Sequence, residues 1–191
     1  MRQSHRAGEI LFVADAGQPM PVVNARAGEG REAALFIAVV GASHYTFAEA
    51  PGSQSLPEWI GSPVWTCAAL SGGPQVVVPA NLKAPVSRGH RYEPPLTRTY
   101  AALAQPYGVA IVPARAARPR DKAKVEVGVQ VVERWMLARL RQHTFCSLLE
   151  LHTAIADLLG ALNQRPCKKL PGSRQRFVES LERPALRPLP A

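Results

Sequence analysis

The stretch from Pro119 to Glu126 opens the longest helical pattern in the chain and constrains the fold more than any other segment. Asp121 is suited to cap the start of this helix, because its carboxylate can accept hydrogen bonds from the free amides of the first turn. Apolar residues then recur at spacings of three and four, at Val125, Val129, Val132, Met136 and Leu140. This pattern predicts an amphipathic helix from Asp121 to about Gln142, seated on a core.

Glu126 lies one residue beside this apolar stripe and follows five basic residues, which are Arg115, Arg118, Arg120, Lys122 and Lys124. Two interpretations of Glu126 fit. It is either a solvated charge that balances its neighbours or a metal ligand beside a nucleic-acid backbone. The bases are either a solvated surface run or a set of phosphate contacts, which position a protein on DNA without reading its sequence. We favour DNA contact for the five bases.

Length and charge limit the possible classes of protein. The 191 residues suffice for one domain with a real core, and 47% apolar residues exclude a disordered chain. A formal net charge of +9 fits a polyanionic partner, although it does not choose among DNA, RNA and an anionic membrane surface. The three cysteines are widely spaced, which argues against a disulfide framework. No apolar run approaches about 18 residues. We therefore expect a soluble, cytoplasmic protein.

The order of predicted elements indicates the fold class. Three strands joined by short turns, one of them at Gln18-Pro19, precede an alternation of helices and strands. Pro63 falls inside the first helix and predicts a kink or two short pieces. Ser147 and Glu150 form a capping box that starts the last helix. Strands are expected at residues 10–15, 20–24, 33–40, 75–79 and 109–112, with residues 44–48 left open as an extension of the meander. Helices are expected at residues 56–64, 96–107, 121–142 and 148–162. This is the order of the α/β ribonuclease-H-like fold, a mixed five-stranded sheet flanked by helices.

The two ends of the chain differ in composition from the middle. Residues 1–8 are polar and predict a disordered N-terminus, and residues 9–164 form the predicted domain. Residues 165–191 are basic and proline-rich, which predicts a linker or tail. The basic run of this segment comprises Arg165, Lys168, Lys169, Arg174 and Arg176. It either lies along DNA or keeps a disordered tail soluble.

Several strings, taken in order and at their intervals, resemble one family. They are Phe12-Val13 followed by Ala16-Gly17, Gly41-Ala42-Ser43, Pro79 with Asn81-Leu82-Lys83, Arg91-Tyr92-Glu93-Pro94, the stretch from Pro119 to Glu126, Arg139-Leu140-Arg141, and Phe145-Cys146-Ser147-Leu148. The chain resembles the IstA-type transposases of bacterial insertion sequences, which carry a retroviral-integrase-like DDE core. The resemblance covers roughly residues 8 to 190. Members also have an N-terminal helix-turn-helix region and further C-terminal sequence, so the chain resembles a core fragment.

The resemblance implies a transposase that cuts and joins DNA ends with two divalent metals, Mg²⁺ or Mn²⁺. Its implied partners are double-stranded DNA (the transposon ends and the target), an ATPase helper subunit and further copies of the chain. The implied location is the bacterial cytoplasm, at the nucleoid. In-line displacement at a phosphodiester uses two metals, which hard oxygen ligands hold. The family supplies three carboxylates for this purpose, and Glu126 matches the third of them.

The other two carboxylate positions depart from the family pattern. At the first, the family has Phe-Val-Asp, whereas Ala14 stands here with Asp15 next to it. Adjacent strand residues point to opposite faces, so Asp15 replaces the ligand only if the strand slips or bulges. At the second, the family reads Pro-Asp-Asn-Leu-Lys, whereas this chain has Ala80 followed by Asn81, a neutral and poor substitute.

Glu126 and Asp15 are therefore the candidate catalytic and metal-binding residues of a catalytically impaired integrase core. The alternative is a non-catalytic remnant that binds DNA or a transposase partner. Other chemistries find less support. His143 and Cys146 have zinc-like spacing with Cys167 farther on, but no fourth ligand follows at zinc spacing. His44, His90 and His152 have no nucleophile partnered with an acid. Trp59, Trp65 and Trp135 fall in helical patterns and are expected in the core.

Overall fold

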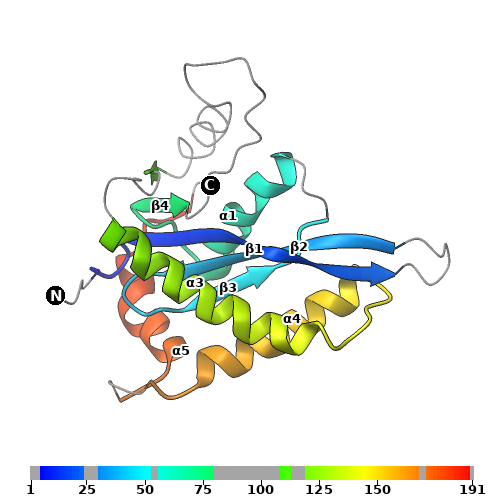
Figure 1. The fold of residues 1–191 in the computed structure, drawn as a ribbon. Coiled ribbons are helices and arrows are strands. Elements are labelled where there is room, and N and C mark those ends of the chain that lie inside the picture. The colour runs from blue at the N-terminus through cyan, green and yellow to red at the C-terminus, as the bar shows by residue number, and fades with distance from the viewer. Residues whose placement is uncertain are drawn as a thin grey trace.

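The computed structural model describes residues 5–23, 30–52, 56–79, 108–112, 119–167 and 171–189 (Figure 1). The expected helix at residues 96–107 lies outside these ranges. In the described part, the strands are β1 (Ile10–Val23), β2 (Gly30–Val40), β3 (Thr46–Glu49), β4 (Val76–Pro79) and β5 (Ala110–Ile111). They form one five-stranded sheet in the order β3-β2-β1-β4-β5. The neighbours β1–β2 and β2–β3 are antiparallel, while β1–β4 and β4–β5 are parallel. The mixed sheet is as predicted.

The predicted turn at Gln18-Pro19 is wrong, because β1 continues through these residues as one long strand. Its pairing with β2 is regular up to Ala16, which lies opposite Leu35, and resumes at Met20, opposite Ala33. The extra residues form a bulge, an irregularity at which a strand tolerates a proline that cannot donate to the ladder. Turn-forming residues therefore mark a break in register here and not the end of a strand.

Helices α3 (Pro119–Leu140) and α4 (Leu148–Gln164) cover one face of the sheet (Figure 1). Helix α3 begins two residues earlier than expected, at a proline whose fixed φ and missing donor suit a first helical position. Asp121 therefore lies in the first turn and not at the cap. The capping box of α4 is confirmed. The Ser147 hydroxyl accepts from the Glu150 amide at 3.1 Å, and the Glu150 carboxylate accepts from the Cys146 amide at 2.7 Å.

Helix α1 (Leu56–Leu70) lies on the other face and continues through Pro63 as one helix, so of the two predicted alternatives the two short pieces are wrong. Ser62 and Pro63 are both buried, as are Cys67 and Leu70. Packing of this apolar helix offsets the cost of its interior proline, since most helix stability in proteins comes from tertiary contacts.

The chain after residue 170 also packs on the α1 face. It forms α5 (Arg174–Phe177), one turn of π-helix η1 (Val178–Glu182) and the 3₁₀ turn η2 (Arg183–Ala185). Val178 is 1% exposed within the core cluster on this face, and Leu186 packs against the same cluster. The sequence predicts a linker or tail from residue 165 onward. The described residues 171–189, here called the C-terminal segment, are instead part of the folded domain, because they supply apolar side chains to its core.

Glu182 joins this C-terminal segment to the rest of the domain. Its side chain is fully buried. One carboxylate oxygen accepts from the Gly8 amide at 2.6 Å and the other from the Ser43 amide at 2.7 Å. Further along, Gly73 and Arg187 exchange backbone hydrogen bonds of 2.8 and 2.9 Å. The C-terminal segment therefore spans the entry to β1, the turn between β2 and β3, and the entry to β4.

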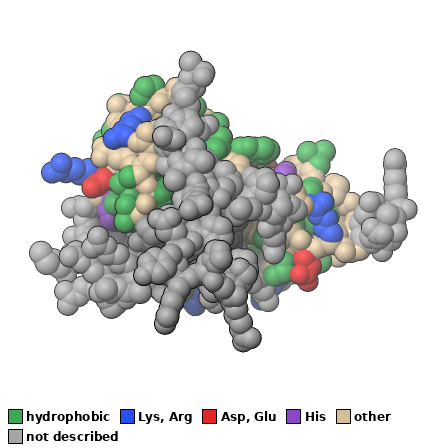
Figure 2. Space-filling model, turned by 90° about the horizontal axis from the view of Figure 1, so that it is seen from above, with side chains coloured by type: hydrophobic (Ala, Val, Ile, Leu, Met, Phe, Trp, Pro, Cys, Tyr) green, Lys and Arg blue, Asp and Glu red, His purple; other side chains and the backbone are tan. Residues whose placement is uncertain are grey.

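In the described ranges, no helix is both long and apolar enough to cross a membrane. Where side chains are described on the face in Figure 2, hydrophobic, basic and acidic groups are interspersed.

Candidate functional site

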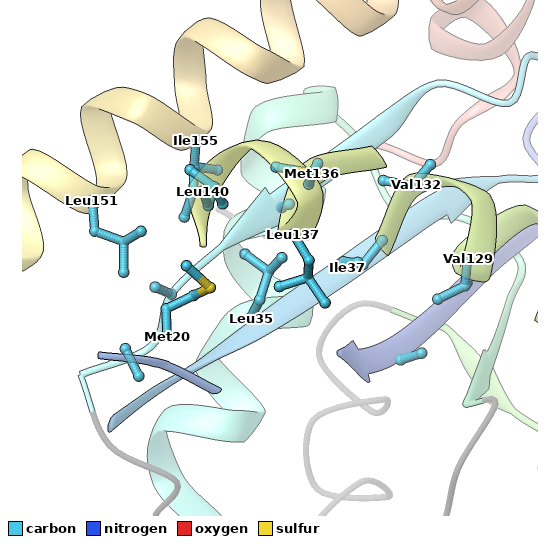
Figure 3. Packing of buried hydrophobic residues seen from close by; sticks show 14 of the residues in the cluster. Met20, Leu35, Ile37, Val129, Val132, Met136, Leu137, Leu140, Leu151 and Ile155 are labelled. Atoms are coloured by element: carbon cyan, nitrogen blue, oxygen red, sulfur yellow. The ribbon is translucent and has the colours of Figure 1, made fainter. Parts of the chain in front are cut away.

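The first carboxylate position of the resemblance lies in the core beneath α3. Ala14 is 5% exposed and belongs to the same buried cluster as Val129 of α3 and Ile37 of β2. Figure 3 shows Val129 of α3 and Ile37 of β2 in this cluster. Strand β4 ends beside Ala14, since its last residue, Pro79, pairs with Val13. Strand β1 at Ala14 thus lies next to the end of β4 and packs with Val129 of α3.

Asp15 pairs in the register of β1 and β2 with Phe36, whose side chain is buried in the cluster on the α1 face. Residues directly opposite each other in an antiparallel pair share a face of the sheet. The pairing is regular from Leu11 to Ala16, so the bulge comes after Asp15. The register therefore does not supply the slip that Asp15 needs, and its role as a ligand stays a prediction.

Glu126 is a residue of α3, three positions before Val129. The roles of Glu126 in metal binding and of Arg120, Lys122 and Lys124 in DNA contact concern side chains outside the described set, and they stay predictions. Arg115 and Arg118 lie outside the described ranges altogether, as do Ala80 and Asn81.

The residues at the first and second carboxylate positions of the resemblance offer no ligand to Mg²⁺ or Mn²⁺. Such ions require several hard, mostly anionic oxygen ligands. Ala14 offers only a methyl group at the position beside α3, and Ala80 offers another after β4. Among the described side chains, no three His, Cys, Asp or Glu residues gather as a metal site would need, a finding that does not extend to Asp15 or Glu126.

The remaining candidates lie apart from this site. His143 and Cys146 are exposed, and Cys167 is half-buried. Burial raises the pKa of the Cys67 thiol to about 11, which makes it a poor nucleophile at neutral pH. The expectation that the tryptophans lie in the core is wrong for Trp65, which is 62% exposed. Trp59 and His90 are outside the described side chains.

The second basic run divides between structural and exposed residues. Arg174 donates from Nη1 to the Leu162 carbonyl at 3.0 Å and so ties α5 to α4. Arg176 is exposed on α5, and Arg165 lies over the ring of Trp135. Lys168 and Lys169 lie outside the described residues. Arg174 therefore has a structural contact, while Arg165 and Arg176 are the described residues of this run that are exposed and could contact DNA. Of these two, Arg165 has a defined aromatic contact.

Sequence reasoning missed a polar cluster at the end of β3. Glu49 is half-buried there, and burial raises the pKa of its carboxyl, while a hydrogen bond from Ser62 and the charge of His152 lower it in part. His152 is held in turn by a contact of 2.7 Å between Nε2 and the Ala50 carbonyl oxygen. The three residues come from β3, α1 and α4, so no spacing within one segment of the sequence predicts the cluster. His152 is thus a structural residue in this arrangement.

The stability of Glu49→Gln relative to the wild type is expected to increase as the pH rises. Because burial raises the pKa of Glu49 above its ordinary value of 4.5, the folded state favours the protonated carboxyl. The stability from this group is fully present below pH 4.5 and is lost as the pH rises through the raised pKa. Melting temperatures of both proteins from about pH 4 to about pH 7 test this. A difference that stays constant with pH would contradict it. Ser62→Ala should steepen the wild-type dependence, since it removes the bond that favours the charged form.

Comparisons with known proteins bear on this site. No protein-family model matches the chain. A curated relative from Burkholderia multivorans, named "Putative transposase for insertion sequence IS408", is 52% identical over 190 residues, covering 100% of this chain and 37% of the relative. Relatives from Sinorhizobium fredii ("Putative transposase y4bL/y4kJ/y4tB") and Pseudomonas fluorescens ("Putative transposase for insertion sequence IS1162") are both 46% identical over 190 residues, covering 100% of this chain and 37% and 34% of the relatives. The chain thus spans little more than a third of these relatives.

A solved structure supports the fold class. The chain is similar to a chain of the simian T-cell lymphotropic virus intasome, solved by cryo-electron microscopy in complex with PP2A regulatory subunit B56 gamma. The TM-score is 0.62 at 15% sequence identity, over 100% of this chain and 60% of that chain. The fold is ribonuclease-H-like. The predicted fold class is confirmed. At this low sequence identity, the similarity shows the fold alone.

Proposed function

We propose that this chain is the integrase-core segment of an IstA-like, DDE-type insertion-sequence transposase that has lost metal-dependent phosphodiester transfer. The observation that carries the proposal is Ala14, a buried methyl group at the point where β1, the end of β4 and α3 meet. Relatives named as transposases align over the whole chain, and the fold supports the assignment to an integrase core. In this proposal the core comprises residues 9–164 together with the C-terminal segment.

The test is calorimetric titration of Mg²⁺ and Mn²⁺ into the wild-type chain and Glu126→Ala, followed by a nicking assay on plasmid DNA. We expect neither protein to bind the ions specifically and neither to nick DNA, because a single remaining carboxylate on the α3 side cannot hold two metals. Specific binding or nicking by the wild-type chain that disappears in Glu126→Ala would overturn the loss of activity. It would also identify Glu126 as a ligand.

A second candidate function is binding of duplex DNA without chemistry, and the net charge of +9 favours it. In this proposal, the bases from Arg115 to Lys124 contact the phosphate backbone. DNA binding that depends on salt and not on sequence, survives Glu126→Ala and weakens in Arg118→Gln with Arg120→Gln would support it. We further propose, from the resemblance, that the whole transposase acts at the nucleoid as an oligomer on transposon ends and target, with an ATPase helper.

A further inference from the structure

Two arginines from different helices converge on one tryptophan ring at the far end of α3. The guanidinium carbon of Arg139 lies 4.2 Å from the ring centre of Trp135, and that of Arg165 lies 5.9 Å from the same centre. Arg139 is in the last turn of α3, and Arg165 is the C-terminal cap of α4. Both arginines are exposed, whereas Trp135 is partly buried against the core. We call these three residues the Arg–Trp–Arg cluster.

A hydrogen bond and a ring contact hold the guanidinium of Arg139 in place. The Nη1 group of Arg139 donates to the Trp135 carbonyl at 3.1 Å, one turn back in the helix, while its other N–H groups remain available. The indole N–H of Trp135 is buried and has no hydrogen-bond partner among the described residues. The ring is therefore held by packing against the core and by the cations over it. An arginine stacked in this way loses less side-chain entropy when it binds a planar anion.

The charges of the cluster are not neutralised within the described structure. Among the described residues, Arg139 and Arg165 contact the ring of Trp135 and Arg139 also contacts its carbonyl, and none of these contacts is with a carboxylate. Each arginine at a helix C-terminus interacts favourably with the helix dipole. This explains each position alone, but not why two cations meet at one ring with no carboxylate among their contacts in the described part of the chain. An external anion would neutralise both.

We infer that the Arg–Trp–Arg cluster binds the phosphodiester backbone of duplex DNA, an inference that rests on the proposed DNA-related function of the chain. The guanidinium fork matches phosphate oxygens in two-point contacts. Because Trp135 is partly buried and covered by Arg139, its ring does not offer a free face for stacking bases. This favours duplex backbone over unpaired bases, whose binding uses open aromatic platforms.

The cluster also extends the basic residues at the start of α3. Position 124 lies eleven residues before Trp135, which is close to three whole helical turns and about 16 Å along the axis. The two positions therefore share a side of α3. A duplex that runs along this side would pass position 124 and then the Arg–Trp–Arg cluster, a distance of about five base pairs.

The test measures the affinity of the wild-type chain for a short duplex by fluorescence anisotropy at several salt concentrations. Arg139→Gln with Arg165→Gln is expected to reduce the slope of log affinity against log salt by about two, with roughly tenfold weaker binding at moderate salt. Arg139→Lys with Arg165→Lys should keep the slope, because it keeps the charge, yet bind several-fold more weakly because it loses the planar fork. Arg6→Gln with Arg31→Gln is the matched control, since it removes two charges from exposed arginines elsewhere.

The outcomes separate this inference from the proposed function. If the cluster variant retains the slope and affinity of the Arg6–Arg31 control while Arg118→Gln with Arg120→Gln binds weakly, the cluster is not a DNA contact but the second candidate function stands. If the wild-type chain binds no duplex at all, both fail. If the cluster variant changes only self-association in sedimentation and not DNA binding, the cluster is an interface between copies, and the inference is overturned.

Discussion

Glu182→Ala is expected to lower the free energy of unfolding by about 2–5 kcal/mol, because it leaves two buried backbone amides without acceptors. The wild-type carboxylate accepts from Gly8 and Ser43 at 2.6 and 2.7 Å, and its side chain is fully buried. Hydrogen bonds to a charged group are roughly twice as strong as neutral ones. Urea unfolding followed by circular dichroism measures the loss. Glu182→Gln keeps the shape of the side chain but turns its amide group toward one of the two donors. Its free energy of unfolding should lie between those of the wild type and Glu182→Ala.

Glu179→Ala is the matched control, since Glu179 is exposed on the same π-helical turn. Its effect is expected to stay within about 0.5 kcal/mol. Gly8→Ala should disturb the same hydrogen bond at its donor, the Gly8 amide. Gly8 has φ of 69°, and a Cβ there would lie 2.3 Å from the Ala185 carbonyl oxygen. Equal stabilities of Glu182→Ala and Glu179→Ala would show that the two hydrogen bonds of Glu182 contribute little to the stability of the domain.

The parts of the fold that could be predicted are those set by local pattern. The valines of β4 and the apolar period of α3 lead directly to their elements. The capping box at Ser147 places the start of α4, because both of its bonds are made within four residues. These signals need no knowledge of the rest of the chain.

The parts that could not be predicted depend on contacts between distant residues. Glu182 bonds to amides 139 and 174 positions away, so its segment resembles a polar, proline-rich tail in isolation. The bulge in β1 is decided by pairing with β2, which a proline and a glycine alone do not reveal. At the candidate site, the sequence identified Ala14 and Ala80 as departures from the family pattern. The burial of Ala14 beneath α3, and the regular pairing of β1 at Asp15, could be known only from the sheet.

Ala14→Asp combined with Ala80→Asp is expected to create a protein that Mg²⁺ stabilises and that nicks DNA. Without the metal, an unpaired carboxylate at the buried position 14 should cost about 2–4 kcal/mol. With Mg²⁺, aspartates at both positions together with Glu126 would restore the three-carboxylate set that the resemblance requires. Melting temperature with and without Mg²⁺, and plasmid nicking, are the measurements.

The control for this restoration is Ala14→Asn with Ala80→Asn, which has nearly the same shape without the charge. Ligand charge, and not packing, is the expected cause, so only the aspartate variant should gain stability from Mg²⁺. Adding Glu126→Ala to the aspartate variant should remove both the stabilisation and the nicking. Equal Mg²⁺ effects in the aspartate and asparagine variants would mean that these three positions do not converge on one site. The absence of chemistry would then have a cause other than the two alanines.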